Sequence, residues 1–148
     1  MRIRILYLLF FILIFCNCNG QQVEKTEAGN TKEHTFQMVS VPSVITEPEE
    51  RAAYLVKHYW DKFDFTDTAL IHLPEITEQA TSNYIDMMKY VPAKVAASSI
   101  KEMMSKASTD SSMFVYFSGL YEKYLYDPNS PMRDESLYIY VLDAVLEA

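Results

Sequence analysis

Prolines divide the part of the chain after residue 46 into amphipathic segments, and this division constrains the fold more than any other feature. Within each segment apolar residues recur at steps of three and four, which is the period of one face of an α-helix. Proline fits the first turn of a helix but breaks its interior, so each proline marks a helix start or a break. The sequence therefore predicts an all-α bundle of about five helices. The dividing residues are Pro48, Pro74, Pro92 and Pro131.

Capping residues place the ends of these helices. Thr46 and Glu49 have the spacing of a capping box for the first helix. The polar run at 108–110 supplies caps before the fourth helix, and Ser130 before Pro131 has the pattern of a cap for the fifth. The predicted helices cover residues 47–62, 74–91, 92–107, the segment from the 108–110 caps to 126, and 131–148.

The fifth predicted helix keeps its apolar period up to the last residue, Ala148. No glycine, asparagine or basic residue closes it, although helix ends usually show such a stop signal. We therefore expect a chain that is truncated or whose end packs against another element. The predicted inward residues of this helix are Tyr138, Val141, Leu142 and Val145.

The N-terminus has the order of an export signal. Arg2 and Arg4 precede an apolar run from Ile5 to Phe15, and polar residues follow at once. The run is shorter than the roughly 20 residues that a membrane-spanning helix needs. Residues 1–17 are therefore predicted to be a lipoprotein-type signal peptide, and the protein is expected to be exported, to the periplasm or anchored at the outer membrane.

Two cysteines end the apolar run, where a bacterial lipoprotein signal places the cysteine that receives lipid. Cys18 is the preferred lipidation site, because short Asn17 precedes it whereas bulky Phe15 precedes Cys16. Ordinary cleavage after Gly20 is the alternative. With lipid on Cys18, the membrane is the first expected partner, and residues 18–40 form a polar, flexible tether. The helical domain then covers 41–148, led by a short extended strap at 39–45.

Composition excludes several classes of function. The chain is acidic, with a net charge of −7 at pH 7, and has no basic stripe, so nucleic acid is not an expected partner. No cysteine follows Cys18, which excludes a disulfide framework and thiol chemistry in the folded part. Gly119 is the only glycine of the helical region, so glycine-rich phosphate-binding loops are absent from the sequence.

Three aspartates lie beside aromatic residues at the predicted end of the first helix. An EF-hand calcium loop needs closely alternating acids, a glycine and a late glutamate, which this segment lacks. Aspartates after a helix more often cap turns or face water, and His58 with one acid does not make a metal site. We expect no metal, no cofactor and no catalytic residue. The cluster consists of Asp61, Asp64 and Asp67 with Trp60, Phe63 and Phe65.

Tyrosines crowd the last two predicted helices. A helical core does not readily bury so many hydroxyls, so some rings should lie at its rim. Amphipathic aromatic side chains exposed together are typical of protein interfaces, and Gly119 among them leaves room for another helix. The predicted interface, for a protein partner or a downstream domain, consists of Tyr121, Tyr124, Tyr126 and Tyr138.

Two sequence blocks, PEERAAYLVKHYWDKFDFTD and LYDPNSPMRDESLYIYVL, carry a family resemblance. From about residue 41 to 148 the chain resembles an uncharacterised helical domain of bacterial envelope lipoproteins. That domain commonly precedes a thioredoxin-like thiol-disulfide oxidoreductase domain, which this chain lacks. The redox function that the resemblance implies therefore belongs to the absent part.

These observations support two main hypotheses. The first is a non-enzymatic, envelope-anchored interaction or spacer module. The second is an accessory N-terminal region of a thiol-disulfide oxidoreductase, which shapes access to its redox site. A hydrolytic or carbohydrate-binding function would rest on the aspartate and aromatic cluster alone and is weaker than both.

Labelling of cells with a palmitate analogue tests the lipid anchor. We expect label on the mature protein, because several acyl chains on one cysteine hold a protein at a membrane, each buried methylene contributing about 0.8 kcal/mol. An unlabelled mature band would contradict the lipoprotein prediction.

Overall fold

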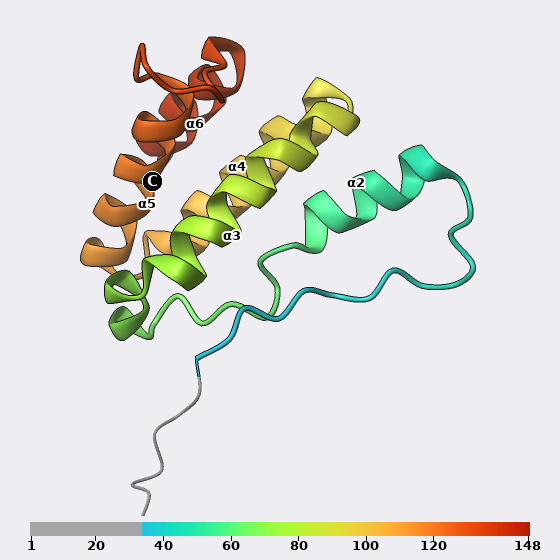
Figure 1. The fold of residues 1–148 in the computed structure, drawn as a ribbon, viewed down its shortest axis with the longest axis horizontal. Helices are drawn as coiled ribbons and strands as arrows, with labels where there is room; N and C mark the ends of the chain where they lie inside the picture. Colours follow the sequence, from blue (N-terminus) through green and yellow to red (C-terminus); the bar gives the residue numbers. More distant parts are fainter. Residues whose placement is uncertain (1–33) are drawn as a thin grey trace, which may run out of the picture. The chain divides into compact units, whose positions relative to one another are not determined.

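A computed structural model describes residues 34–148, which form five α-helices and two short 3-10 helices and, within that range, no strand (Figure 1). The predicted all-α class is therefore confirmed. The predicted signal peptide, Cys18 and the tether up to residue 33 lie outside the described residues. The elements are α2 (Pro48–His58), η1 (Thr68–His72), α3 (Pro74–Met87), η2 (Met88–Tyr90), α4 (Ala93–Ala107), α5 (Ser111–Leu125) and α6 (Glu135–Glu147).

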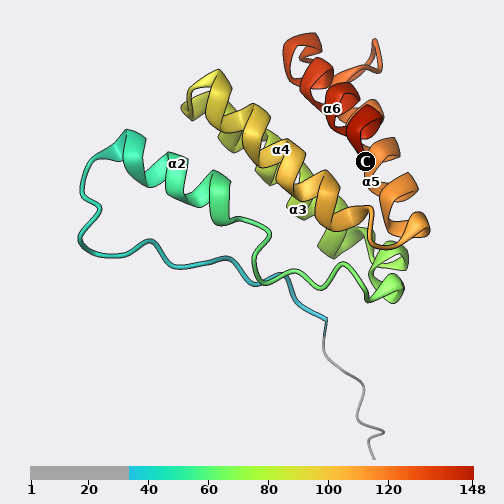
Figure 2. The same cartoon turned by 180° about the vertical axis from the view of Figure 1, so that it is seen from behind.

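Helix α4 is the central element of the bundle. It packs against α2 on one side and against α5 and α6 on the other, and α5 and α6 also pack against each other. Figures 1 and 2 show this order from opposite sides, with α2 set apart from the α5–α6 pair. Helix α3 contacts α2 and α5. The C-terminal pair therefore covers one side of the bundle.

The proline signals predict the helix starts well, but the first capping box does not form. Pro48 and Pro74 open α2 and α3, and Pro92 precedes α4. In α2, however, Glu47 is the N-cap residue and no side chain caps the first turn. Helix α2 also ends at His58, earlier than predicted, because the chain tightens into turns that bring Phe63 back onto Trp60.

Of the caps predicted for the last two helices, the structure confirms the first and contradicts the second. Asp110 caps α5 as predicted, its Oδ1 accepting from the backbone N–H of Ser112 at 2.9 Å and of Met113 at 3.0 Å. The predicted start of the last helix at Ser130 and Pro131 is wrong, because α6 begins at Glu135 with Asp134 as its cap.

The hydroxyl of Ser130 serves the preceding loop instead of a helix. It donates to the carbonyl oxygen of Tyr124 at 2.5 Å and accepts from the backbone N–H of Met132 at 3.2 Å. The loop is closed further by the N–H of Asp134, which donates to the carbonyl oxygen of Leu125 at 3.0 Å. The chain therefore turns back toward α5 before α6 can start.

An extended strap precedes α2, as predicted, and it begins earlier than residue 39. Phe36, which lies within the predicted tether, packs on Tyr59 with ring centroids 4.8 Å apart and meets Trp60 edge-on at 5.5 Å. At the other end of the strap, Arg51 donates to the carbonyl oxygen of Ile45 at 2.7 Å. Both ends of the strap are therefore fastened to the region of α2.

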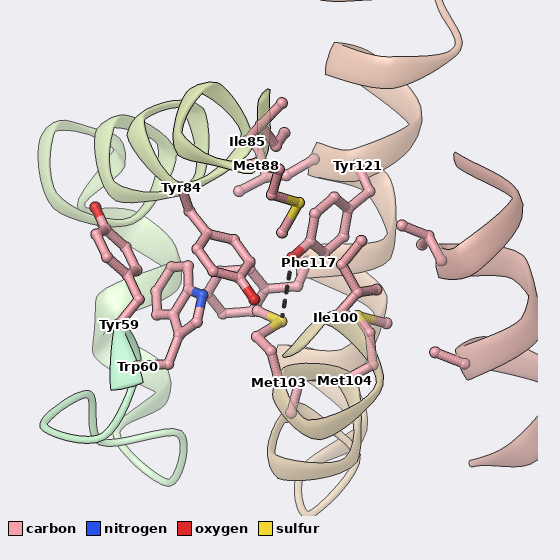
Figure 3. Close-up of a cluster of buried hydrophobic side chains, with 14 of the residues drawn as sticks. Tyr59, Trp60, Tyr84, Ile85, Met88, Ile100, Met103, Met104, Phe117 and Tyr121 are labelled. Atoms are coloured by element: carbon pink, nitrogen blue, oxygen red, sulfur yellow. Dashed lines mark hydrogen bonds between the residues drawn. The ribbon is translucent and has the colours of Figure 1, made fainter. Parts of the chain in front are cut away.

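An aromatic cluster around Trp60 forms one half of the core (Figure 3). Trp60 lies edge-on to Tyr84 and Phe117 at 5.5 and 5.4 Å between ring centroids. Its indole N–H has no hydrogen-bond partner among the described residues, and aromatic ring faces are only weak acceptors for it. The other half of the core is aliphatic and methionine-rich, built from α4, α5 and α6.

A buried hydrogen-bond chain joins three helices. Ser99 of α4 donates to the carbonyl oxygen of Val56 in α2 at 2.7 Å, so its oxygen accepts from the hydroxyl of Tyr84 in α3, at 2.5 Å. All three residues are buried, and burial is the main cause that raises the pKa of Tyr84 above its usual value. One serine thereby satisfies a carbonyl in the last turn of α2 and a core tyrosine hydroxyl.

Ser99→Ala should destabilise the domain by about 2 kcal/mol or more, because it leaves a buried carbonyl and a buried hydroxyl without a partner. Ser98→Ala is the matched control, since Ser98 is exposed and bonds only to Val95 of its own helix. Urea unfolding of both variants measures the difference. Equal midpoints for the two would contradict a stabilising role for the chain of hydrogen bonds.

Candidate functional site

Helix α6 carries two apolar faces, and only one of them is buried. Leu137, Val141 and Ala144 face α4 and α5 in the core. The second face, spaced at steps of three and four along the same helix, points away from the core. It consists of Ile139, Leu142, 43% exposed, and Leu146, 86% exposed.

The prediction that Leu142 points inward is therefore wrong. Val141 takes the buried position, and Leu142 lies about 100° further around the helix, where 43% of its surface is exposed. Sequence reasoning missed Ile139 and Leu146 altogether. Ile139, Leu142 and Leu146 follow one another at steps of three and four, so the sequence does contain a second apolar stripe. Beside the first stripe it is easily interpreted as part of one broad core face.

Helix α5 adds to this surface. Its outer side carries Val115, which is 69% exposed, and Gly119 one turn later. Tyr126, the residue that caps the C-terminal end of α5, follows two turns after Gly119 on the same side. Together these residues of α5 and α6 form what we call the C-terminal apolar face. It consists of Val115, Gly119, Tyr126, Ile139, Leu142 and Leu146.

The outer faces of the other helices are polar. The exposed positions of α3 include Glu75, Gln79, Asn83 and Asp86, while those of α4 include Lys94, Ser98, Lys101 and Glu102. Single exposed apolar residues are common on soluble domains, but several on two adjacent helices are typical of a covered surface. The C-terminal apolar face is therefore the part of the described chain that differs most from an ordinary solvated surface.

Two of the predicted interface tyrosines meet at one end of this face. The rings of Tyr126 and Tyr138 stack with centroids 5.1 Å apart and planes 20° from parallel. Tyr126 is exposed and Tyr138 is half-buried. Partial burial, followed by the charge of Glu122, raises the pKa of the Tyr138 hydroxyl. The stack provides a flat aromatic surface at the loop between α5 and α6.

Tyr124 is held inside the domain rather than offered to a partner. Its hydroxyl donates to Glu78 Oε1 at 2.8 Å, and Lys123 pairs with the same oxygen. Burial and the bond to Glu78 raise the pKa of Tyr124 to about 12, while the bonds from Lys123 and Tyr124 lower the pKa of Glu78. These contacts join α5 to α3 through exposed and half-buried groups.

Tyr121 is a core residue, which corrects its placement at an interface. Its side chain is fully buried, and its hydroxyl donates to the sulfur of Met103 at 3.6 Å, as Figure 3 shows. Burial raises the pKa of this hydroxyl well above its usual value. The soft methionine sulfur lets the core accept a tyrosine that sequence reasoning expected at the rim.

Gly119 is exposed in the middle of α5, and the domain itself gives no reason for a glycine there. A Cβ added at this position would meet no heavy atom within 4 Å. Glycine inside a helix costs about 1 kcal/mol relative to alanine. No other part of the described residues packs against the backbone of α5 at Gly119, which lies within the C-terminal apolar face.

The aspartates near α2 take part in local structure. Asp64 Oδ1 accepts from the backbone N–H of Thr66 at 3.0 Å, which confirms a turn-capping role for this residue. Asp61 bonds to His58 at 2.7 Å and to Lys106 at 3.1 Å. Burial acts to raise the pKa of Asp61, but the bonds to His58 and Lys106 outweigh it and lower the pKa.

Within residues 34–148 no group of three or more acidic, histidine or cysteine side chains could hold a metal ion.

A broad groove of about 870 Å³ adjoins the C-terminal apolar face beside the start of α5. Ile71 of η1 and Tyr116 line it, together with Val115 of the face. The hydroxyl of Tyr116 is paired with that of Thr77 at 2.7 Å, so the ring is fixed. The rest of its lining is polar and consists of Thr68, His72, Asp110, Ser111 and Ser112. None of the described helices is long and apolar enough to cross a membrane.

The structure is that of a small all-helical domain in which Asp61, Asp64 and Glu78 bond to groups of the same domain. The chain belongs to a family described as a domain of unknown function, DUF5106, whose pattern matches residues 16–148. No curated protein matches this chain.

A solved structure resembles the domain closely. It is the crystal structure of a thioredoxin-like protein from Bacteroides caccae, 47% identical in sequence, with a TM-score of 0.74. The match covers 77% of this chain but only 41% of that protein. This chain therefore spans less than half the length of the thioredoxin-like protein that it resembles.

Alanine substitutions should distinguish the core tyrosine Tyr121 from the surface tyrosine Tyr126 by their effect on stability. Tyr121→Ala should lower the free energy of unfolding by about 3–5 kcal/mol, as for other large aromatic residues removed from a core. Tyr126→Ala should change it by less than about 1 kcal/mol, because the ring is half exposed. Urea unfolding followed by circular dichroism gives both values. A loss at Tyr126 as large as that at Tyr121 would contradict its surface role.

Proposed function

We propose that this chain is a non-catalytic, envelope-anchored helical module that positions another protein domain. The observation that carries the proposal is the C-terminal apolar face, because α5 and α6 present apolar residues outward where the other helices present polar ones. The groups that could act in catalysis, such as Asp61 and Glu78, bond to partners of the same domain. The module therefore acts by contact.

The anchor belongs to the same proposal. Lipid on Cys18 holds the module at a membrane in the periplasm or at the outer membrane, and the polar segment after Cys18 separates the helices from the bilayer. The support is the order of the N-terminal sequence, in which basic residues, an apolar run and a cysteine follow one another.

In a second candidate function, the domain that the module positions is a thioredoxin-like domain. The observation that favours it is the 47% identity to a thioredoxin-like protein of which this chain matches less than half. The module is then the accessory region of a thiol-disulfide oxidoreductase and shapes access to its redox site. The coding sequence beyond residue 148 distinguishes the candidates, since a paired-cysteine motif after a strand supports the second and a stop codon removes it.

Cell fractionation tests the anchored module. Cys18→Ser should move the protein from the membrane pellet to the soluble fraction, because the lipid acceptor is lost. Cys16→Ser is the matched control and should leave the protein with the membrane. A Cys18→Ser protein that stays in the pellet would contradict the anchor. Turnover of a disulfide or ester substrate by purified residues 19–148 would contradict the non-catalytic function.

A further inference from the structure

The C-terminal apolar face has the properties of a surface that another domain covers. Most of the 13 residues of α6 are apolar, and a helix with apolar residues on two faces is normally buried on both. Within the described residues, α4 and α5 cover one face of α6, and Ile139, Leu142 and Leu146 remain outside. The exposed side of α5 continues this surface through Val115 and Tyr126.

Gly119 indicates how closely the covering element approaches. The backbone of α5 is bare at this position, and no atom of the domain lies within 4 Å of where a Cβ would be. A glycine inside a helix often marks a place where another backbone comes close. Its neighbours on the outer side of α5, Val115 one turn before and Tyr126 two turns after, would flank such a contact.

A second copy of this chain fits the face poorly. The chain has a net charge of −7, so copies repel one another. Exposed Glu122 lies between Gly119 and Tyr126 on α5, and exposed Glu135 lies one turn before Ile139 on α6. A symmetric dimer through this face would bring these carboxylates near their equivalents. These acidic side chains favour a different domain, whose contact surface has both apolar and basic side chains.

We propose that the C-terminal apolar face docks the thioredoxin-like domain of a longer polypeptide that contains this chain, with backbone of that domain against Gly119. The proposal rests on the second candidate function. It adds the surface, which the similarity to a thioredoxin-like protein does not identify. More than half of that protein lies outside the match, and in such a polypeptide the residues after Ala148 begin beside Leu146, at the end of α6.

Docking at this place has a consequence for the redox domain. The face lies on α5 and α6, which α4 fixes relative to α2 and the strap. A domain docked there is held in one orientation relative to the N-terminal side of the module, rather than moving freely on a linker. The module then fixes the orientation of the redox site relative to α2.

The substitution Gly119→Ala should change stability in opposite directions in two chains. In residues 19–148 alone the added methyl meets open space and favours the helix, so the melting temperature should rise by about 4 °C. In the longer polypeptide the methyl meets the docked backbone, so the melting temperature of the helical module should fall. An equal rise in both chains would overturn the proposal.

Charge placed on the face should release the docked domain. Leu142→Arg and Leu146→Arg should increase the radius of gyration of the longer polypeptide, measured by small-angle X-ray scattering. Val44→Arg and Tyr90→Arg are matched controls, because Val44 is 85% and Tyr90 67% exposed, and neither lies on α5 or α6. An unchanged radius for the Leu142 and Leu146 variants would overturn the proposal.

The possible failures are distinguishable. A coding sequence without a thioredoxin-like domain overturns both the second candidate function and the docking proposal. A thioredoxin-like domain that stays docked in every variant overturns the docking surface alone. Dimers of residues 19–148 in sedimentation velocity that Leu142→Arg dissociates would assign the face to a second copy, and this also overturns the proposal.

Discussion

The hydrogen-bond chain from Tyr84 through Ser99 to the Val56 carbonyl fixes the arrangement on which the other helices depend. Its three members come from α3, α4 and α2, and each is buried, so the chain is satisfied only when these helices meet in one register. Helix α4 is thereby fixed on one side, and its other side carries α5 and α6. The position of the C-terminal apolar face therefore follows from a contact on the opposite side of α4.

Polar and apolar side chains take opposite places on the two sides of the domain that the proposal depends on. Carboxylates and hydroxyls such as Asp61, Glu78 and Tyr124 bond to other groups of the domain, whereas three apolar side chains of α6 point outward, namely Ile139, Leu142 and Leu146. Membership of a family of unknown function and likeness to part of a thioredoxin-like protein are consistent with a module that acts through contact. In the proposed role, specificity depends on the shape of the apolar face and on the acidic side chains Glu122 and Glu135.

Sequence reasoning succeeded where a signal acts within a few residues. Pro74 and Asp110 open their helices as predicted, because ring geometry and a short carboxylate side chain act on the adjacent turn. It failed where a distant group competes for the same atoms. Ser130 has the pattern of a helix cap, but the Tyr124 carbonyl takes its hydroxyl, so Asp134 caps α6. For the candidate site, the tyrosine excess pointed to α5 and α6 and to exposed Tyr126, but it included buried Tyr121 and missed exposed Ile139 and Leu146.

The sequence by itself determined the helical class, the approximate number of helices and most of their starts, because apolar period, proline and local caps act along the chain. Only the tertiary structure decided which of two apolar stripes on α6 is buried, and that Tyr121 lies in the core while Tyr126 lies outside. Periodicity defines the faces of a helix, but a face becomes core or surface through neighbours that are distant in sequence. On α6 both stripes have the correct spacing, and the positions of α4 and α5 select one of them.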